Sequence, residues 1–282
     1  MPITPQELIA NLGDLPPLPQ VAVQVLKIAA DPDASTDDLK QVIATDVALT
    51  AQILKIANSA MFGMMREVRT LTQAIMTLGF STIKSVVIAS SAKNLYSRGN
   101  TGLQERLMWE HALVTALAGR AYGRDLRFSR AEECFLGGLL HDIGKSVLGL
   151  KFPDRYGTLI RTAYNDGTDL MQMELDVFGF DHAMVGEALL HAWNLASSLE
   201  SVVRWHHDPA HAPEADRTLT ALVALGNRLA HDQKIGIGTS EHLEDATAQA
   251  LDILGLAPEQ LEEHRESVLS ALEMDKSLIT DF

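Results

Sequence analysis

The stretch "FLGGLLHDIGKSVLGL", residues 135–150, places one ionisable pair, His141 and Asp142, inside an otherwise apolar run. An imidazole and a carboxylate cost free energy in such surroundings unless each finds a partner. Three interpretations of the pair are open: a metal site, an acid/base pair, or a polar helix end that lies close to the core.

Helix start and stop signals recur on both sides of this stretch. Capping boxes are predicted at "TPQE" (4–7), "TLTQ" (70–73) and "SRAE" (129–132). Alternating polar and apolar runs, which are typical of strands, are missing from the pattern. The sequence therefore predicts an all-α fold, with helix ends expected at Gly79, Gly99, Gly123 and Gly255.

A polar, glycine-containing break, "YSRGNTG" at 96–102, separates two helical patterns. We therefore expect two packed helical subdomains, residues 1–98 and 99–235. The remaining residues, 236–282, are expected to form a C-terminal helical extension.

Composition and charge favour a cytoplasmic globular protein. The chain has 282 residues, of which 46% are hydrophobic and 21% charged, and its one cysteine excludes an intramolecular disulfide framework. No apolar stretch is expected to span a bilayer, and the N-terminus lacks the pattern of a signal peptide. The net charge of −14 would repel nucleic acid, so neither nucleic acid nor a membrane is an expected partner.

All ten histidines lie at or beyond position 111. A single histidine near a core is more often a hydrogen-bonded structural residue than a ligand. Only several histidines together would indicate a metal site. Six residues lie inside or at the ends of separate apolar helices: His111, His141, Asp142, His182, His206 and His207. If they converge, the site is rich in nitrogen with one carboxylate, which suits iron, manganese, nickel or zinc.

A plainer alternative for these six residues is that Asp142 accepts a hydrogen bond from one histidine and the others are solvated. Among the remaining histidines, His191 is the weaker candidate because it lies about half a turn out of phase with His182. The other four lie in polar contexts and are expected to be solvated: His211, His231, His242 and His264.

The order of a single His, a His-Asp pair, a later His and a tandem His-His resembles the HD phosphohydrolase superfamily. Three N-terminal stretches resemble its HDOD branch, which occurs in bacterial signalling proteins: "LPPLPQVAVQVLKIAADPDAS", "DVALTAQILKIANSAMFG" and "VRTLTQAIMTLGFSTIKSVV". The resemblance covers about residues 8–235. It implies that the second subdomain is an HD-like helical bundle carrying the histidine cluster.

The resemblance also implies roles for single residues. Lys145 matches the lysine that follows the His-Asp pair in competent relatives, so catalytic roles are implied for Asp142 and Lys145. Asn227 stands where those enzymes supply an aspartate ligand, and their Gly-Tyr-Pro signature is missing after the tandem histidines. Of the glutamates, Glu174 or Glu187 could replace the missing charge.

The resemblance implies a signalling or regulatory module with a retained metal site, acting through a protein partner or a nucleotide ligand. The alternative is a metal-dependent phosphohydrolase or phosphodiesterase acting on a nucleotide or cyclic nucleotide. Because only one clear carboxylate is present, we expect weak or absent hydrolysis of cyclic dinucleotides.

Overall fold

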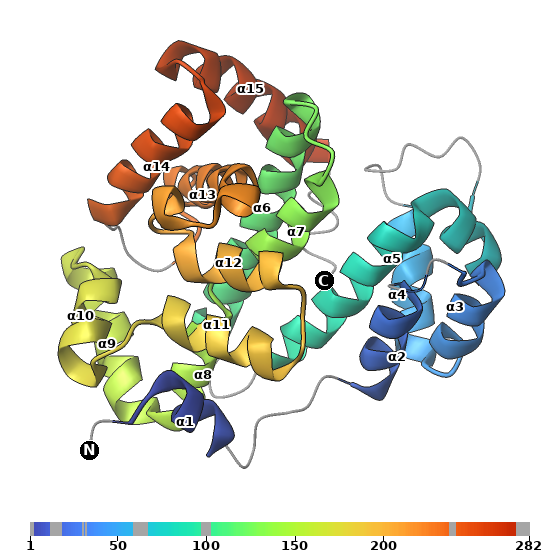
Figure 1. Ribbon diagram of the computed structural model, residues 1–282, viewed down its shortest axis with the longest axis horizontal. Helices are drawn as coiled ribbons and strands as arrows, with labels where there is room; N and C mark the ends of the chain where they lie inside the picture. Colours follow the sequence, from blue (N-terminus) through green and yellow to red (C-terminus); the bar gives the residue numbers. More distant parts are fainter. Residues whose placement is uncertain are drawn as a thin grey trace. The chain divides into compact units, whose positions relative to one another are not determined.

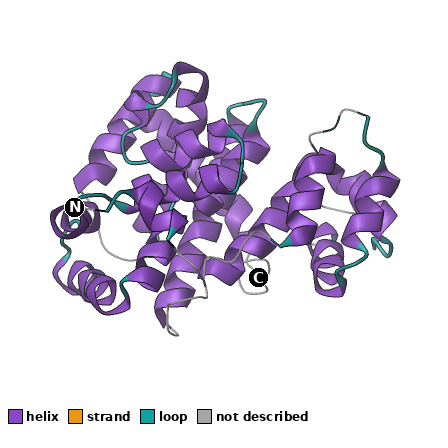
Figure 2. Ribbon diagram, turned by 60° about the horizontal axis from the view of Figure 1, so that its bottom comes forward, coloured by secondary structure: helices purple, strands orange, loops and turns teal. Residues whose placement is uncertain are grey.

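The computed structural model describes residues 3–11, 19–29, 31, 33–58, 67–96, 103–236 and 241–274. Within these ranges the secondary structure is helical and contains no strand, as Figure 2 shows by colour. The all-α prediction is therefore confirmed. Most of the predicted break at 96–102, with Gly99, lies outside the described residues.

The chain forms two compact units that differ from the expected subdomains. One unit comprises residues 1–15 and 94–269, and the other comprises residues 16–93 and 270–282. Helix α1 (Pro5–Ala10) belongs to the unit that carries the histidines, because it buries Leu8 and packs on α11 (His182–Ala192) (Figure 1).

The smaller unit is built from α2 (Gln20–Ala29), α3 (Thr36–Ile43), α4 (Val47–Ala57) and most of α5 (Leu71–Tyr96). Gly79 has a φ of 75°, so the helix end predicted there is a kink within α5. The capping box predicted at 70–73 is present: Thr70 and Gln73 exchange side-chain and backbone hydrogen bonds.

The side chain of Asn58 links the end of α4 to the segment before α5 by hydrogen bonds. Its Nδ2 donates to the carbonyls of Leu54 and Val68, both at 2.8 Å, and its Oδ1 accepts from the Val68 amide at 2.7 Å. One amide side chain thus joins the last turn of α4 to the segment that leads into α5. This gives a structural reason for an asparagine in the Ala-Asn-Ser stretch.

One window of α5, Leu71–Lys93, is long and apolar enough to cross a membrane by length and composition alone. This corrects the expectation that no stretch approaches that length. More than half of the window, 56%, is buried inside the protein. A core helix of a globular unit meets the same criteria, so the window by itself does not indicate a membrane span.

The larger unit carries the remaining helices, except that the final residues of the last helix, from Ser270 on, belong to the smaller unit. They are α6 (Leu103–Asp125), α7 (Ala131–Leu140), α8 (Ile143–Lys151), α9 (Pro153–Asp166), α10 (Leu170–Phe178), α11, α12 (Ser197–Trp205), the short 3₁₀ helices η2 (Pro209–His211) and η3 (Glu214–Asp216), α13 (Arg217–Asp232), α14 (Glu241–Leu254) and α15 (Pro258–Met274). Helices α6, α7 and α13 pack together, and α11 packs against both α8 and α12 (Figure 1).

Two local predictions in this unit were wrong and two are confirmed. Gly123 lies inside α6 and does not end it, and α7 begins after Arg130 without a side-chain cap, so no capping box forms at 129–132. Gly255 ends α14 with a φ of 64°, and the predicted box at 4–7 caps α1.

Candidate metal centre

The packing of the larger unit brings the six candidate ligands together from helix ends and one helix interior. His111 lies within α6, His141 and Asp142 link α7 to α8, His182 begins α11, and the tandem histidines follow α12. They form two triads: His111, His141 and Asp142, and His182, His206 and His207. Within each triad one ligand atom per residue lies within 4.8 Å of the others.

The carboxylate of Asp142 faces both triads. Its Oδ2 lies 3.3 Å from His141 Nε2 and 3.5 Å from His111 Nε2. Its Oδ1 lies 3.3 Å from His182 Nε2 and 3.8 Å from His206 Nε2. A single side chain therefore presents one oxygen to each group of imidazoles.

Backbone carbonyls set the tautomer of three of the histidines. His111 Nδ1 lies 2.9 Å from the Ile235 oxygen, His141 Nδ1 lies 2.6 Å from the Gly138 oxygen, and His206 Nδ1 lies 2.8 Å from the Val203 oxygen. Because a carbonyl only accepts, Nδ1 carries the proton in each ring. In the neutral ring Nε2 is then left with its lone pair, which is the form that binds a metal.

The Nε2 atoms of His111 and His141 face each other at 3.2 Å. Two neutral rings that are both protonated at Nδ1 cannot hydrogen-bond through Nε2, because neither nitrogen has a proton to donate. Two metal–nitrogen bonds of about 2.0–2.1 Å, at angles of about 90–110°, separate their nitrogens by about 2.9–3.4 Å. The observed separation fits that range.

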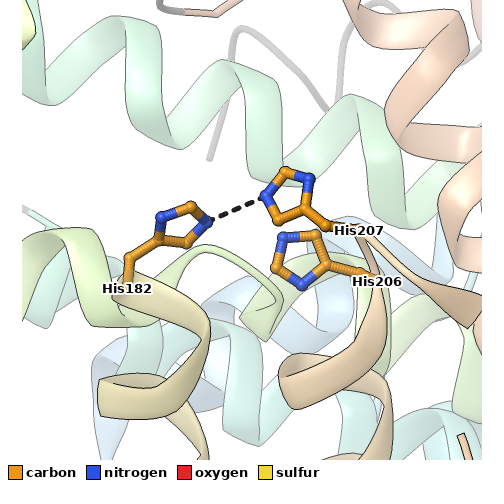
Figure 3. A group of neighbouring side chains, drawn as sticks. All are labelled: His182, His206 and His207. Carbon is orange, nitrogen blue, oxygen red and sulfur yellow. Dashed lines mark hydrogen bonds between the residues drawn. The ribbon is translucent and has the colours of Figure 1, made fainter. Parts of the chain in front are cut away.

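The second triad also has a close approach between two rings, and unsatisfied buried atoms lie in it and on Asp142. Figure 3 shows His182 and His207 turned toward each other, with 3.1 Å between their Nε2 atoms, and His206 beside them. His206 Nε2, His207 Nδ1 and Asp142 Oδ1 are buried without a hydrogen-bond partner. Buried polar atoms rarely lack partners. A cation between the imidazoles would satisfy His206 Nε2 and Asp142 Oδ1, which both have lone pairs to offer. The residues present therefore fit a metal.

The surroundings favour the neutral form of three imidazoles beside an ionised carboxylate. Burial lowers the pKa of His111, His206 and His207 well below the usual value. Burial opposes ionisation of Asp142, but His141 and Lys145 outweigh it and hold its pKa well below the usual range. These are the protonation states that metal ligands require.

His182 differs from these three imidazoles. Burial would lower its pKa, but the carboxylates of Glu174 and Asp142 outweigh burial and raise the pKa to about 9. Without a cation, His182 therefore holds the positive charge that the surrounding carboxylates favour.

Comparison with known proteins identifies the family of this chain. The HDOD domain profile matches residues 15–209. The chain belongs to the HDOD family. Among curated proteins, an uncharacterized protein from Treponema pallidum (strain Nichols) is 26% identical over 221 residues, which cover 77% of this chain and 42% of the relative. The chain thus spans about two-fifths of the length of that curated relative.

Solved structures show the same fold. An HDOD domain protein of unknown function from Geobacter sulfurreducens has a TM-score of 0.78 at 21% identity, covering 98% of this chain and 94% of the other. A protein from Shewanella amazonensis, provisionally named a phosphohydrolase, has a TM-score of 0.74 at 26% identity, covering 96% and 97%. The HDOD fold therefore extends over nearly the whole chain.

In this HDOD chain Glu174 orients a histidine. Its Oε2 accepts from the Nδ1 of His182 at 2.6 Å and from the His182 backbone amide at 2.8 Å. Its Oε1 accepts from the Tyr156 hydroxyl at 2.6 Å, and the carboxylate is fully buried. Both oxygens are thus committed, which corrects the idea that Glu174 supplies the missing ligand charge. A carboxylate on the far nitrogen of a ligating histidine fixes its ring and tautomer.

Replacing Glu174 by Gln is expected to lower metal affinity about 10–100-fold while the helical fold is retained. The amide removes the charge that makes His182 basic, and its nitrogen cannot accept the bonds made now. Chelator competition measures the affinity. Asp176→Asn, an exposed position on the same helix, is the matched control. Equal affinities in the two variants would contradict this positioning role.

Two further residues were weighed against the site. Glu187, expected from its helical phase to point away from His182, lies beside Arg204 at 3.7 Å and is partly exposed, so it does not complete the site. His231, expected to be solvated, packs edge-on against His111 with ring centroids 4.9 Å apart. The signal for His231 was available in the sequence, since it follows Asn227 by four residues and shares its helix face.

Lys145 and Asn227 are both buried, at 9% and 2% exposure. The Lys145 ammonium donates to Asp142 Oδ2 at 2.7 Å. The Asn227 side-chain oxygen is buried on α13 without a hydrogen-bond partner.

Four other histidines pair with carboxylates outside the two triads: His191 with Glu200, His211 with Asp208, His242 with Asp169 and His264 with Asp125.

Proposed function

We propose that this HDOD chain is a metal-binding regulatory module that acts through a protein partner or a ligand. The observation that carries this proposal is the burial of five of the six candidate ligands, with His207 partly buried. His141 and His206 are 0% exposed and Asp142 is 5% exposed. Catalytic metal sites keep an open coordination position, whereas structural sites are closed by protein.

Charge also favours regulation over turnover. Two cations about 3.5–4 Å apart repel each other and need anionic ligands to be held together. Asp142 is the one carboxylate of the two triads, and its Oδ2 is already paired with Lys145. Asn227 is neutral. We therefore expect weak or absent hydrolysis of cyclic dinucleotides, even with metal bound.

A second candidate function is a metal-dependent phosphohydrolase acting on a nucleotide or cyclic nucleotide. The placement of Asp142 between two triads favours it, because a bridging carboxylate suits a pair of metals. In that case Lys145 would neutralise phosphate charge. The provisional name of the Shewanella structure supports the same candidate.

The expected metal is iron, manganese, nickel or zinc, since the ligand set is mostly imidazole. We place the module in the cytoplasm, and its buried, unpaired Cys134 supports a reducing compartment.

Metal analysis and a substrate panel test the proposal on the full chain. We expect close to one transition metal per chain after reconstitution, and a higher melting temperature than in chelator-treated protein, because a ligand of the native state stabilises it. Phosphomonoesters, nucleotides and cyclic dinucleotides should be hydrolysed no faster than in the buffer control. Turnover of about 1 per second or more would favour the enzyme. Failure to retain metal would contradict both candidates.

A further inference from the structure

A pocket of about 240 Å³ lies at the end of α9 and the end of α13, within the larger unit. Its wall includes Tyr164, His231, Lys234 and Gly236. The lining residues that the structure describes include a lysine and a histidine but no carboxylate. The lysine and the histidine favour an anion locally, against the repulsion from a chain whose net charge is −14.

Two of the carboxylates that neighbour the lining residues in sequence are paired with bases, whereas Asp166, next to Gly167, is exposed at the end of α9. Asp232 lies 2.8 Å from Arg228 and 3.0 Å from Arg265. Asp169 lies 3.2 Å from His242. These pairs reduce the negative charge that would otherwise oppose an anion beside Lys234.

The wall offers an aromatic face and an exposed lysine. Tyr164 is 59% exposed and presents a flat face for a planar group. Lys234 has a φ of 58°, as is common for the residue that follows a helix: the Ile235 amide donates to the Ala230 carbonyl at 3.0 Å and ends α13. The Lys234 side chain is exposed beside the pocket.

The pocket wall also contacts a candidate metal ligand. The carbonyl of Ile235 accepts the Nδ1 proton of His111 at 2.9 Å. A Cβ on Gly236 would lie 2.7 Å from the same nitrogen, so this wall packs directly on the imidazole. The ring of His231 packs edge-on against the His111 ring, at 4.9 Å between centroids. Ile235, Gly236 and His231 therefore hold the His111 ring, which gives the pocket a route of contact to the metal centre.

We propose that this pocket binds a small anion with a phosphoryl group and an aromatic ring, of the nucleoside monophosphate class. Lys234 and His231 bind the phosphoryl group, and Tyr164 stacks on the ring. Pockets for whole drug-sized ligands are about 300–1,000 Å³, so a compact nucleotide suits this volume better than a dinucleotide. Binding itself is independent of the metal; its effect on the metal centre, through Ile235 and His111, rests on the proposed function.

The test is calorimetric titration of the full chain with AMP and with inorganic phosphate, in chelator-treated and in metal-loaded protein. We expect saturable AMP binding that survives chelation, and weaker binding of phosphate, which lacks a ring. Lys234→Asn, which tolerates the left-handed backbone, should weaken AMP binding about tenfold through the loss of a charge-assisted hydrogen bond. Tyr164→Ala should weaken it about three- to tenfold through the loss of stacking. Lys151→Gln, an exposed lysine on α8, should leave it unchanged.

Two results would overturn the proposal that this pocket binds AMP. AMP binding that disappears on chelation would place the phosphate on the metal, and binding that is equal in Lys234→Asn and Lys151→Gln would place it elsewhere. If AMP binds without metal, and metal never binds, the pocket stands and the proposed function fails. If both bind, AMP should change metal affinity and metal should change AMP affinity by the same factor.

Discussion

Asp142→Asn is expected to lower metal affinity by about 100-fold or more. Loss of an outer partner of a ligand costs about 10–100-fold, and loss of a charged ligand should cost more. Asp142 is the one residue whose oxygens face both groups of imidazoles, at 3.3 Å on each side. Metal content per chain and chelator competition measure the loss.

Variants of single histidines test whether Asp142 matters more for metal binding than one imidazole does. His111→Gln removes a ligand from one triad and His207→Gln removes one from the other. Each should therefore reduce metal binding less than Asp142→Asn does. Asp245→Asn, an exposed aspartate on α14, is the matched control. Full metal content in Asp142→Asn, with helicity unchanged by circular dichroism, would show that this carboxylate is not a ligand.

Gly144→Ala is expected to destabilise the larger unit by about 3 kcal/mol or more, at the upper end of the cost of overpacking. A Cβ at Gly144 would lie 1.9 Å from the His182 carbonyl oxygen and 2.8 Å from the Gly186 amide nitrogen. Both are backbone atoms, so α8 and α11 must move apart. That movement would separate Asp142 from His182, and metal affinity should fall together with stability.

Gly157→Ala is the matched control, since it makes the same change inside α9. There the nearest atom to a new Cβ is Arg161 Nη1 at 3.4 Å, at the end of a flexible side chain. Alanine is a better helix former than glycine, so this variant should gain up to about 1 kcal/mol. Denaturant unfolding measures both variants. Similar stabilities would mean that the close approach at Gly144 relaxes without cost.

The sequence by itself determined the helical class and the set of candidate ligands. Capping boxes at 4–7 and 70–73 form as predicted because a cap depends on residues within one turn. The histidines at 111, 141 and 182 were recognisable because each lies in an apolar context where an unpaired polar group is costly. Their convergence was an inference from that cost, and the structure brings them together.

Only the tertiary structure decided how these residues are used. Gly123 has the local pattern of a helix end, but it lies inside α6, where a Cβ would approach Ala131 of α7 at 3.1 Å. Glu174 has the chemistry of a ligand, but its neighbours Tyr156 and His182 make it an orienting group. His231 has a polar sequence context, but α13 packs it on His111.

These three outcomes share one physical reason. Local patterns report the interactions that a residue makes within its own helix, whereas packing brings together atoms that are far apart along the chain. The two oxygens of Asp142 illustrate this, because one faces His111 of α6 and the other faces His182 of α11. The division of the ligands into two triads around one carboxylate depends on how α6, α8 and α11 pack, and the sequence contains no local signal for it.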